Sequence, residues 1–160
     1  MLVATLALVV SAACSRVPPL ANTSASADDV AVAVFDALAR EDRAALEALA
    51  LSETEFRDHV WPQLPAARPE RNLPFSYVWG DLRQKSAGAL SNTLGRVGGQ
   101  RFDLVGVTFS GQTDYDTFTV HREAMFRVRA STRDQTDLRV IGSMIEKDGA
   151  WKVFSYVVDE

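Results

Sequence analysis

The stretch IEKDGAWKV, residues 145–153, decides the fold because it has the pattern of a tight β-hairpin. Asp148 and Gly149 lie between two runs of strand-forming residues, and both tolerate the positive φ angles that a two-residue hairpin loop favours. Apolar side chains occupy both alternating faces of the two expected strands. We therefore expect helices to cover one face of the sheet, and the curl of the sheet, a loop or a partner to cover part of the other.

The sheet extends backwards from this hairpin. Strands are expected at 102–110, 118–130, 138–147 and 151–159, with a turn at 111–116 between the first two. Helices are expected only before residue 100. Helices followed by a meander of strands are typical of an α+β fold, so we predict N-terminal helices packed on a curved antiparallel sheet of about four strands, in a cone-like arrangement.

Four helices are predicted from their capping residues and apolar stripes. Ser26 or Asp28 caps the first, Asp42 begins a second over 44–50, and the capping box that starts at Ser52 opens a third. The fourth follows Pro74, and its apolar stripe is Trp79, Leu82, Ser86, Leu90, Leu94 and Val97. Four prolines between 62 and 74 predict a loop rather than a helix, and a break of the fourth helix is expected near Gly88.

Length and charge favour one globular domain that does not bind nucleic acid. The chain has 160 residues, of which 47% are hydrophobic and 24% charged, and this is enough for one core. Its net charge of -4 argues against contacts with many phosphates. Arginines gather late in the chain, but acidic residues lie between them, as on a solvated strand edge.

The first fourteen residues predict export. An apolar run over 2–10 is followed by small residues and then Cys14, the only cysteine, so 1–13 is expected to be a signal peptide. The sequence Ser-Ala-Ala-Cys at 11–14 resembles the lipobox of bacterial lipoproteins, and this resemblance implies a lipid on Cys14 and a membrane anchor in the bacterial cell envelope. The alternative is a plain signal peptide, which would leave a free thiol and a secreted or soluble periplasmic protein.

Residues 15–27 lack an apolar period and contain two prolines, so 14–27 is expected to be a lipidated cysteine with a flexible tether. A chain of this length reaches on the order of 20 Å. The folded domain is then expected over 28–160, close to a membrane but outside it.

The order of helices and long strands, ending in EKDGAWKV at 146–153 and Tyr156, resembles the nuclear-transport-factor-2-like or cystatin-like superfamily. The resemblance implies a sheet curled round a helix, in a fold that hosts enzymes, transport factors and binding modules alike. The residues expected near a pocket in that cone are Trp61, Tyr77, Trp79, Asp103, Tyr115, His121 and Tyr156.

Recognisable catalytic or metal-binding motifs are absent from the sequence. His59 and His121 are the only histidines, and neither belongs to a metal-ligand pattern such as HExxH. A GxSxG nucleophile motif is also missing. We therefore expect no metal site, no cofactor and no assigned catalytic residue.

Two functions remain open. The first is a non-enzymatic envelope domain that binds a protein partner or a small apolar ligand through its open sheet face, or that forms a homodimer through the sheet. The alternative, which the superfamily resemblance suggests, is an isomerase-like or dehydratase-like enzyme. It would use Asp81, Asp103, Asp116 or His121 inside the cone, with Tyr77, Tyr115 or Tyr156 as hydrogen-bond donors.

Overall fold

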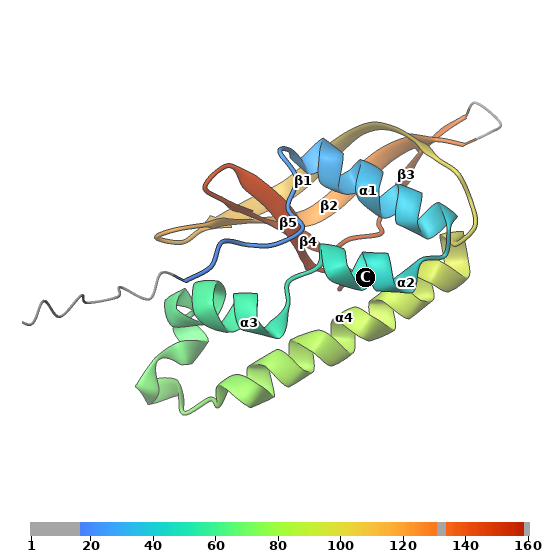
Figure 1. Ribbon diagram of the computed structural model, residues 1–160. Coiled ribbons are helices and arrows are strands. Elements are labelled where there is room, and N and C mark those ends of the chain that lie inside the picture. Colours follow the sequence, from blue (N-terminus) through green and yellow to red (C-terminus); the bar gives the residue numbers. More distant parts are fainter. Residues whose placement is uncertain (1–16, 131–133, 159–160) are drawn as a thin grey trace, which may run out of the picture.

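The structure is a computed structural model that describes residues 17–130 and 134–158. It has the predicted α+β fold, in which four helices precede an antiparallel sheet (Figure 1). The helices are α1 (Ala27–Ala39), α2 (Arg43–Leu49), α3 (Glu53–Glu55) and α4 (Phe75–Val97). The strands are β1 (Asp103–Asp114), β2 (Thr119–Arg129), β3 (Gln135–Leu138), β4 (Ser143–Lys147) and β5 (Ala150–Ser155).

The helix starts are confirmed at their predicted caps. The Ser26 side chain accepts a hydrogen bond from the backbone of Asp29 before α1, and Asp42 does the same for Ala45 before α2. Ser52 and Glu55 form the complete reciprocal capping box before α3. Each cap satisfies a backbone N–H that the first helical turn leaves without a partner.

The chain stays helical beyond α3, through the rest of the expected third helix and into the loop predicted over 62–74. It continues as a π-helical turn, Phe56–Val60, and then as three 3₁₀ turns, Trp61–Gln63, Pro65–Ala67 and Pro69–Arg71. Each of the three 3₁₀ turns has a proline in its first two positions. Proline excludes a long helix but its fixed φ suits the start of a short turn, which explains both the correct and the wrong part of the prediction.

The fourth helix is unbroken. α4 runs for 23 residues through Gly88, where a break was expected. Ala has a higher helix propensity than Gly by only about 1 kcal/mol, and the buried residues Leu90, Thr93 and Val97 further along the helix supply packing that overrides this preference.

The sheet has five strands in one contiguous unit, with β1, β2, β4 and β5 in order and β3 paired to β2. The third predicted strand, 138–147, forms only in its second half, as β4, because residues 139–142 are not strand; β3 lies just before it, over 135–138. β3 pairs with the second half of β2, and β4 pairs with the first half. The break includes Gly142, which is packed so closely that an added Cβ would lie 1.5 Å from the carbonyl oxygen of Val157. The predicted hairpin is confirmed, since Lys147 pairs with Ala150 across Asp148 and Gly149, whose φ angles are 53° and 76°.

Helical segments cover both faces of the sheet, not one. Met144 and Ile145 are neighbours on β4 and therefore point to opposite faces. Met144 belongs to a core with α1, where Phe35 packs edge-on against Phe126 at 5.7 Å. Ile145 belongs to a second core with Phe56 and the start of α4. The second face was expected to be covered by a partner, a loop or the curl of the sheet. It is covered instead by the chain's own segment from α3 to the start of α4.

The expected tether is wrong for its second half. Leu20 is buried, and Ser24 exchanges two backbone hydrogen bonds of 2.8 Å with Trp151 at the outer edge of β5. The backbone N–H of Leu51 also donates to Val153 on that edge, at 3.0 Å. Residues 18–26 are therefore part of the domain, and Ser24 covers the outer edge of β5.

Residues 1–13 and Cys14 lie outside the described residues, so the signal peptide and the lipid anchor stay predictions. Within the described ranges, none of the helices is both long enough and apolar enough to cross a bilayer.

Candidate functional site

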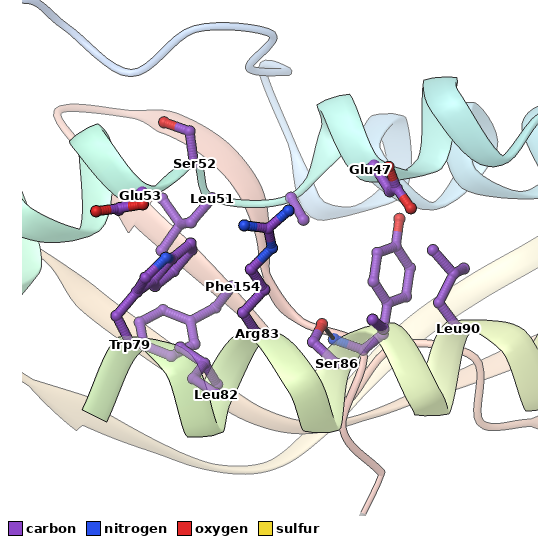
Figure 2. A pocket seen from close by; sticks show the side chains of 13 residues that line it. Glu47, Leu51, Ser52, Glu53, Trp79, Leu82, Arg83, Ser86, Leu90 and Phe154 are labelled. Carbon is purple, nitrogen blue, oxygen red and sulfur yellow. Dashed lines mark hydrogen bonds between the residues drawn. The ribbon is translucent and has the colours of Figure 1, made fainter. Parts of the chain in front are cut away.

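A cavity of about 370 Å³ lies between α4, the connection from α2 to α3, and the end of β5 (Figure 2). Its apolar walls are Ala50, Leu51, Trp79, Leu82, Ala87, Leu90, Phe154 and Tyr156. Its polar groups are Glu47, Ser52, Glu53, Arg83 and Ser86. We call it the α4 cavity.

One face of α4 forms the floor of this cavity. Positions 79, 82, 83, 86, 87 and 90 follow the helical spacing of one face, so the predicted stripe supplies Trp79, Leu82, Ser86 and Leu90 together. β5 supplies Phe154 from the opposite side, and Trp79 packs against Phe56 with ring centroids 5.3 Å apart. The same stripe that builds the second core thus also shapes the cavity.

Tyr156 holds the end of the sheet against the helices at one side of the cavity. Its hydroxyl donates to the carbonyl of Leu46 at 2.7 Å, and its backbone N–H donates to Ser86 Oγ at 3.1 Å. Burial raises the pKa of Tyr156, so its hydroxyl stays protonated and acts as a donor. Both contacts fix the wall of the cavity.

The indole of Trp79 has a buried Nε1–H for which the described residues provide no acceptor. Buried donors are usually paired, so this one is an exception. The atom is enclosed by its neighbours.

Charged groups lie at the rim of the α4 cavity. Glu47 pairs with Arg43 at 3.4 Å, and Glu53 pairs with Arg57 at 2.6 Å. Arg83 rises from α4 towards the α2–α3 connection, between Trp79 and Ser86 (Figure 2). It makes no ion pair or hydrogen bond with any other residue that the structure describes.

Of the seven predicted pocket residues, only Trp79 and Tyr156 line this cavity. Tyr77 is 66% exposed on the outer side of α4, and Asp103 is exposed at the start of β1. Trp61 packs edge-on against Phe75 in the second core. These residues do not gather in one place because the sheet separates two cores instead of enclosing a single cone.

Tyr115 lines a different cavity of about 330 Å³, over the side of the sheet formed by Val120 and Phe154. Its ring stacks on Phe118 at 4.5 Å. The second cavity is also lined by Arg122 and Glu123. Its walls come mainly from the sheet and not from the helices.

His121 lies on the opposite face of the sheet, next to Glu146. Its Nε2 is 2.9 Å from a carboxylate oxygen of Glu146, and its ring lies between Trp151 at 4.5 Å and Phe109 at 5.1 Å. The side chain is 14% exposed, and it lines neither of these two cavities. A general acid or base must reach a bound substrate, and this geometry gives His121 no such approach from those cavities.

The α4 cavity itself contains no histidine and no buried carboxyl among the described residues that line it. Its two acids, Glu47 and Glu53, are exposed and paired with arginines. The enzyme alternative, which requires a buried carboxyl or histidine in a pocket, gains no support from this cavity. It stays a prediction.

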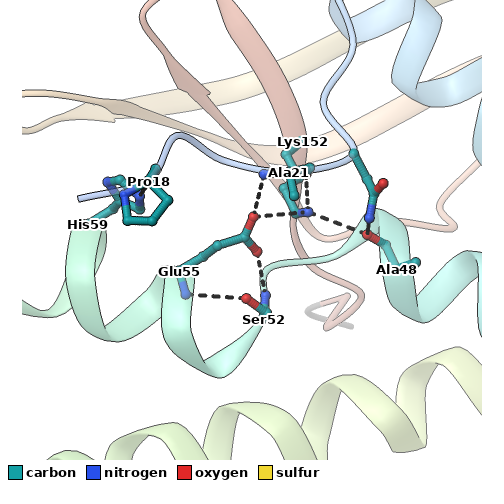
Figure 3. Close-up of polar contacts among 8 residues, drawn as sticks. Pro18, Ala21, Ala48, Ser52, Glu55, His59 and Lys152 are labelled. Carbon is teal, nitrogen blue, oxygen red and sulfur yellow. Dashed lines mark hydrogen bonds and ion pairs between the residues drawn. The ribbon is translucent and has the colours of Figure 1, made fainter. Parts of the chain in front are cut away.

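A buried ion pair lies on the other side of the α2–α3 connection (Figure 3). Lys152 is 2% exposed, and its Nζ lies 3.3 Å from Glu55 and donates to the carbonyls of Ala21 and Ala48. Glu55 in turn accepts from the backbone N–H groups of Ala21 at 2.7 Å and Ser52 at 2.8 Å. Lys152 and Glu55 thus join the N-terminal segment, α2, α3 and β5, and we call them the Lys152–Glu55 clamp.

The ionisation of the clamp follows from its surroundings. Burial lowers the pKa of Lys152, and Glu55 offsets part of this effect. Burial alone would raise the pKa of Glu55, but hydrogen bonds from Ser52 and Ala21, together with Lys152, bring it below its usual value. This pair was not predicted from the sequence. The available signal was that Lys152 lies two positions before Phe154, on the same apolar face of the predicted strand.

In the described ranges there is no group of three or more His, Cys, Asp or Glu side chains that could hold a metal ion. No protein family, curated protein or solved structure matches this chain.

Proposed function

We propose that this chain is a non-catalytic domain of the bacterial cell envelope that binds a small, largely apolar molecule in the α4 cavity. The observation that carries the proposal is the cavity itself: about 370 Å³, with walls that are mainly aliphatic and aromatic and with a few polar groups at the rim. Ligand sites in proteins have this size and this combination of apolar walls with a few polar groups.

Rigid elements support the walls. The aromatic contact of Trp79 with Phe56 and the two hydrogen bonds of Tyr156 hold them without any ligand. A preformed site loses less conformational entropy on binding than one that must first be ordered.

The binding test uses decanol, a neutral apolar probe, and isothermal titration calorimetry on the full chain. Ala87 lies on the cavity wall, whereas Ala44 is exposed on α2 and lines neither of the two cavities. We expect Ala87→Trp to fill the cavity and abolish binding, and the smaller Ala87→Leu to weaken it. Ala44→Trp is the matched control and should bind as the parent does. Absence of decanol binding, or equal binding by Ala87→Trp with unchanged circular dichroism, would refute the proposal.

The proposed anchor is a lipid on Cys14, which the leader sequence supports. The residues from Pro18 onwards are held by the domain, because the carbonyl of Pro18 bonds to His59 at 2.8 Å. At most about 14 Å of chain then separates Cys14 from Pro18, at roughly 3.5 Å per residue. The proposal therefore places the domain directly at the membrane surface, closer than a free tether would.

Mass spectrometry of the chain purified from bacterial membranes tests the anchor. A diacylglycerol or triacyl modification on Cys14 is expected. The Cys14→Ser variant should no longer be found in the membrane fraction. A mature N-terminus with an unmodified thiol would show that the chain is exported without an anchor.

A second candidate function is partner binding or homodimerisation along β1. In the described sheet β1 pairs with β2 alone, so the other side of this 12-residue strand has no strand partner. Unpaired edges of this kind add strands from other chains. Analytical ultracentrifugation should show a dimer that Val105→Lys, at an exposed position of β1, converts to monomer. A parent chain that is monomeric at all concentrations excludes the homodimer.

A further inference from the structure

We infer that the ligand of the α4 cavity is an amphipathic carboxylate, an aliphatic chain whose acidic head is held by Arg83. This inference rests on the proposed function and names the chemical class of its ligand.

The charges that the structure describes at the rim of the α4 cavity leave one cation without a counter-charge. Glu47 and Glu53 each have an arginine of their own, at 3.4 and 2.6 Å, whereas Arg83 is left without a partner among the described residues. The two acids are exposed, so their effect on a neighbouring group is screened by solvent and salt. After these pairings, the rim carries one uncompensated positive charge.

The position of Arg83 suits the acidic head of such a ligand. The guanidinium of Arg83 stands between Trp79 and Ser86 and points across the cavity from α4 to the α2–α3 connection (Figure 2). A guanidinium offers parallel N–H donors that match the two oxygens of a carboxylate. An aliphatic chain attached to that carboxylate would lie on Leu82, Leu90 and Phe154.

Ser86 provides a second donor beside Arg83. It lies three positions further along α4, on the same face of the helix. Its Oγ accepts from the backbone of Tyr156 at 3.1 Å, but its own hydroxyl hydrogen meets no acceptor within the described part of the chain. Two adjacent donors that lack acceptors, above an apolar floor, fit an anionic oxygen ligand better than a neutral hydrocarbon.

The volume of the α4 cavity suits a medium-chain ligand. Liquid water occupies roughly 30 Å³ per molecule, so a cavity of about 370 Å³ holds on the order of a dozen non-hydrogen atoms. A medium-chain fatty acid such as decanoate has this size.

The test compares decanoate with decanol, which has the same chain and no charge, by titration calorimetry of the full chain at constant ionic strength. We expect the parent chain to bind decanoate more tightly than decanol. Arg83→Gln should weaken decanoate by at least about tenfold and leave decanol unchanged, because a hydrogen bond to a charged group is lost. Arg83→Lys should retain part of the preference for decanoate.

Lys85→Gln is the matched control. Lys85 lies two positions from Arg83 on α4, is exposed, pairs with Asp81 and does not line the cavity. This variant removes the same charge from the same helix and should bind decanoate as the parent does.

The outcomes separate this inference from the proposed function. If decanol binds but decanoate is not preferred, or if Arg83→Gln and Lys85→Gln weaken decanoate equally, the carboxylate assignment is wrong and the apolar site stands. If neither probe binds, the proposed function fails and this inference fails with it.

Discussion

The substitution Lys152→Met tests whether the Lys152–Glu55 clamp holds the N-terminal segment on the domain. Methionine has nearly the same length and volume as the lysine stem, so the packing of this 2% exposed side chain is preserved while its charge is lost. The carbonyls of Ala21 and Ala48 lose their donor, and the carboxylate of Glu55 loses its cation at 3.3 Å.

The expected loss of unfolding free energy is about 3 kcal/mol, the lower end of the cost of leaving one partner of a buried ion pair alone. The lower end applies because Glu55 keeps two backbone donors, Ala21 and Ser52. For a chain of this size such a loss lowers the melting temperature by about 6–12 °C.

Urea unfolding followed by tryptophan fluorescence measures this loss as a shift of the midpoint at constant slope. The control is Lys85→Met, which breaks an exposed ion pair and should change the free energy of unfolding by no more than about 0.5 kcal/mol. The double variant Lys152→Met with Glu55→Met replaces both charges by apolar groups and should be less destabilised than the sum of the two single variants. A Lys152→Met variant within about 0.5 kcal/mol of the parent, or exact additivity in the double variant, would refute the reasoning.

Three further predictions concern pH and glycine positions. The pKa of Glu55 is lower in the folded state than its usual 4.5, so the unfolded chain binds more protons in acid. The free energy of unfolding should therefore fall as the pH drops below about 4.5. Glu55→Gln should flatten this fall, and urea midpoints measured across the acid range would show it. Gly142→Ala should lower the free energy of unfolding by about 3 kcal/mol or more in thermal unfolding, because the new Cβ would lie 1.5 Å from a carbonyl oxygen. Gly106→Ala is the control, since nothing lies within 4 Å of its new Cβ. Gly88→Ala should stabilise by about 0.5–1 kcal/mol, since nothing lies within 4 Å of the new Cβ and alanine favours the helix; an unchanged or lower unfolding midpoint would contradict this.

The sequence predicted several of the residues that line the α4 cavity, but it did not predict that they form a cavity. The stripe Trp79, Leu82, Ser86 and Leu90 was predicted as a core face, and the structure shows that part of this face lines a cavity. Periodicity tells which side chains share a face of a helix, but not how closely the opposite wall approaches them. Arg83 was missed because a lone arginine between apolar positions carries no local signal.

The sequence by itself determined the caps at Ser26, Asp42 and Ser52 and the hairpin at Asp148 and Gly149. These features depend on hydrogen bonds and φ angles within about four residues, so the local residues are sufficient to specify them.

Only the tertiary structure decided the broken third strand, the cover on both sheet faces, the closed edge of β5 and the burial of Lys152. The contact between Lys152 and Ala21 joins positions 131 apart in the chain, and the one between Glu55 and Ala21 joins positions 34 apart. Such contacts form only when the whole chain packs, because the free energy that holds a buried charge or shapes a cavity comes from groups that no local pattern brings together.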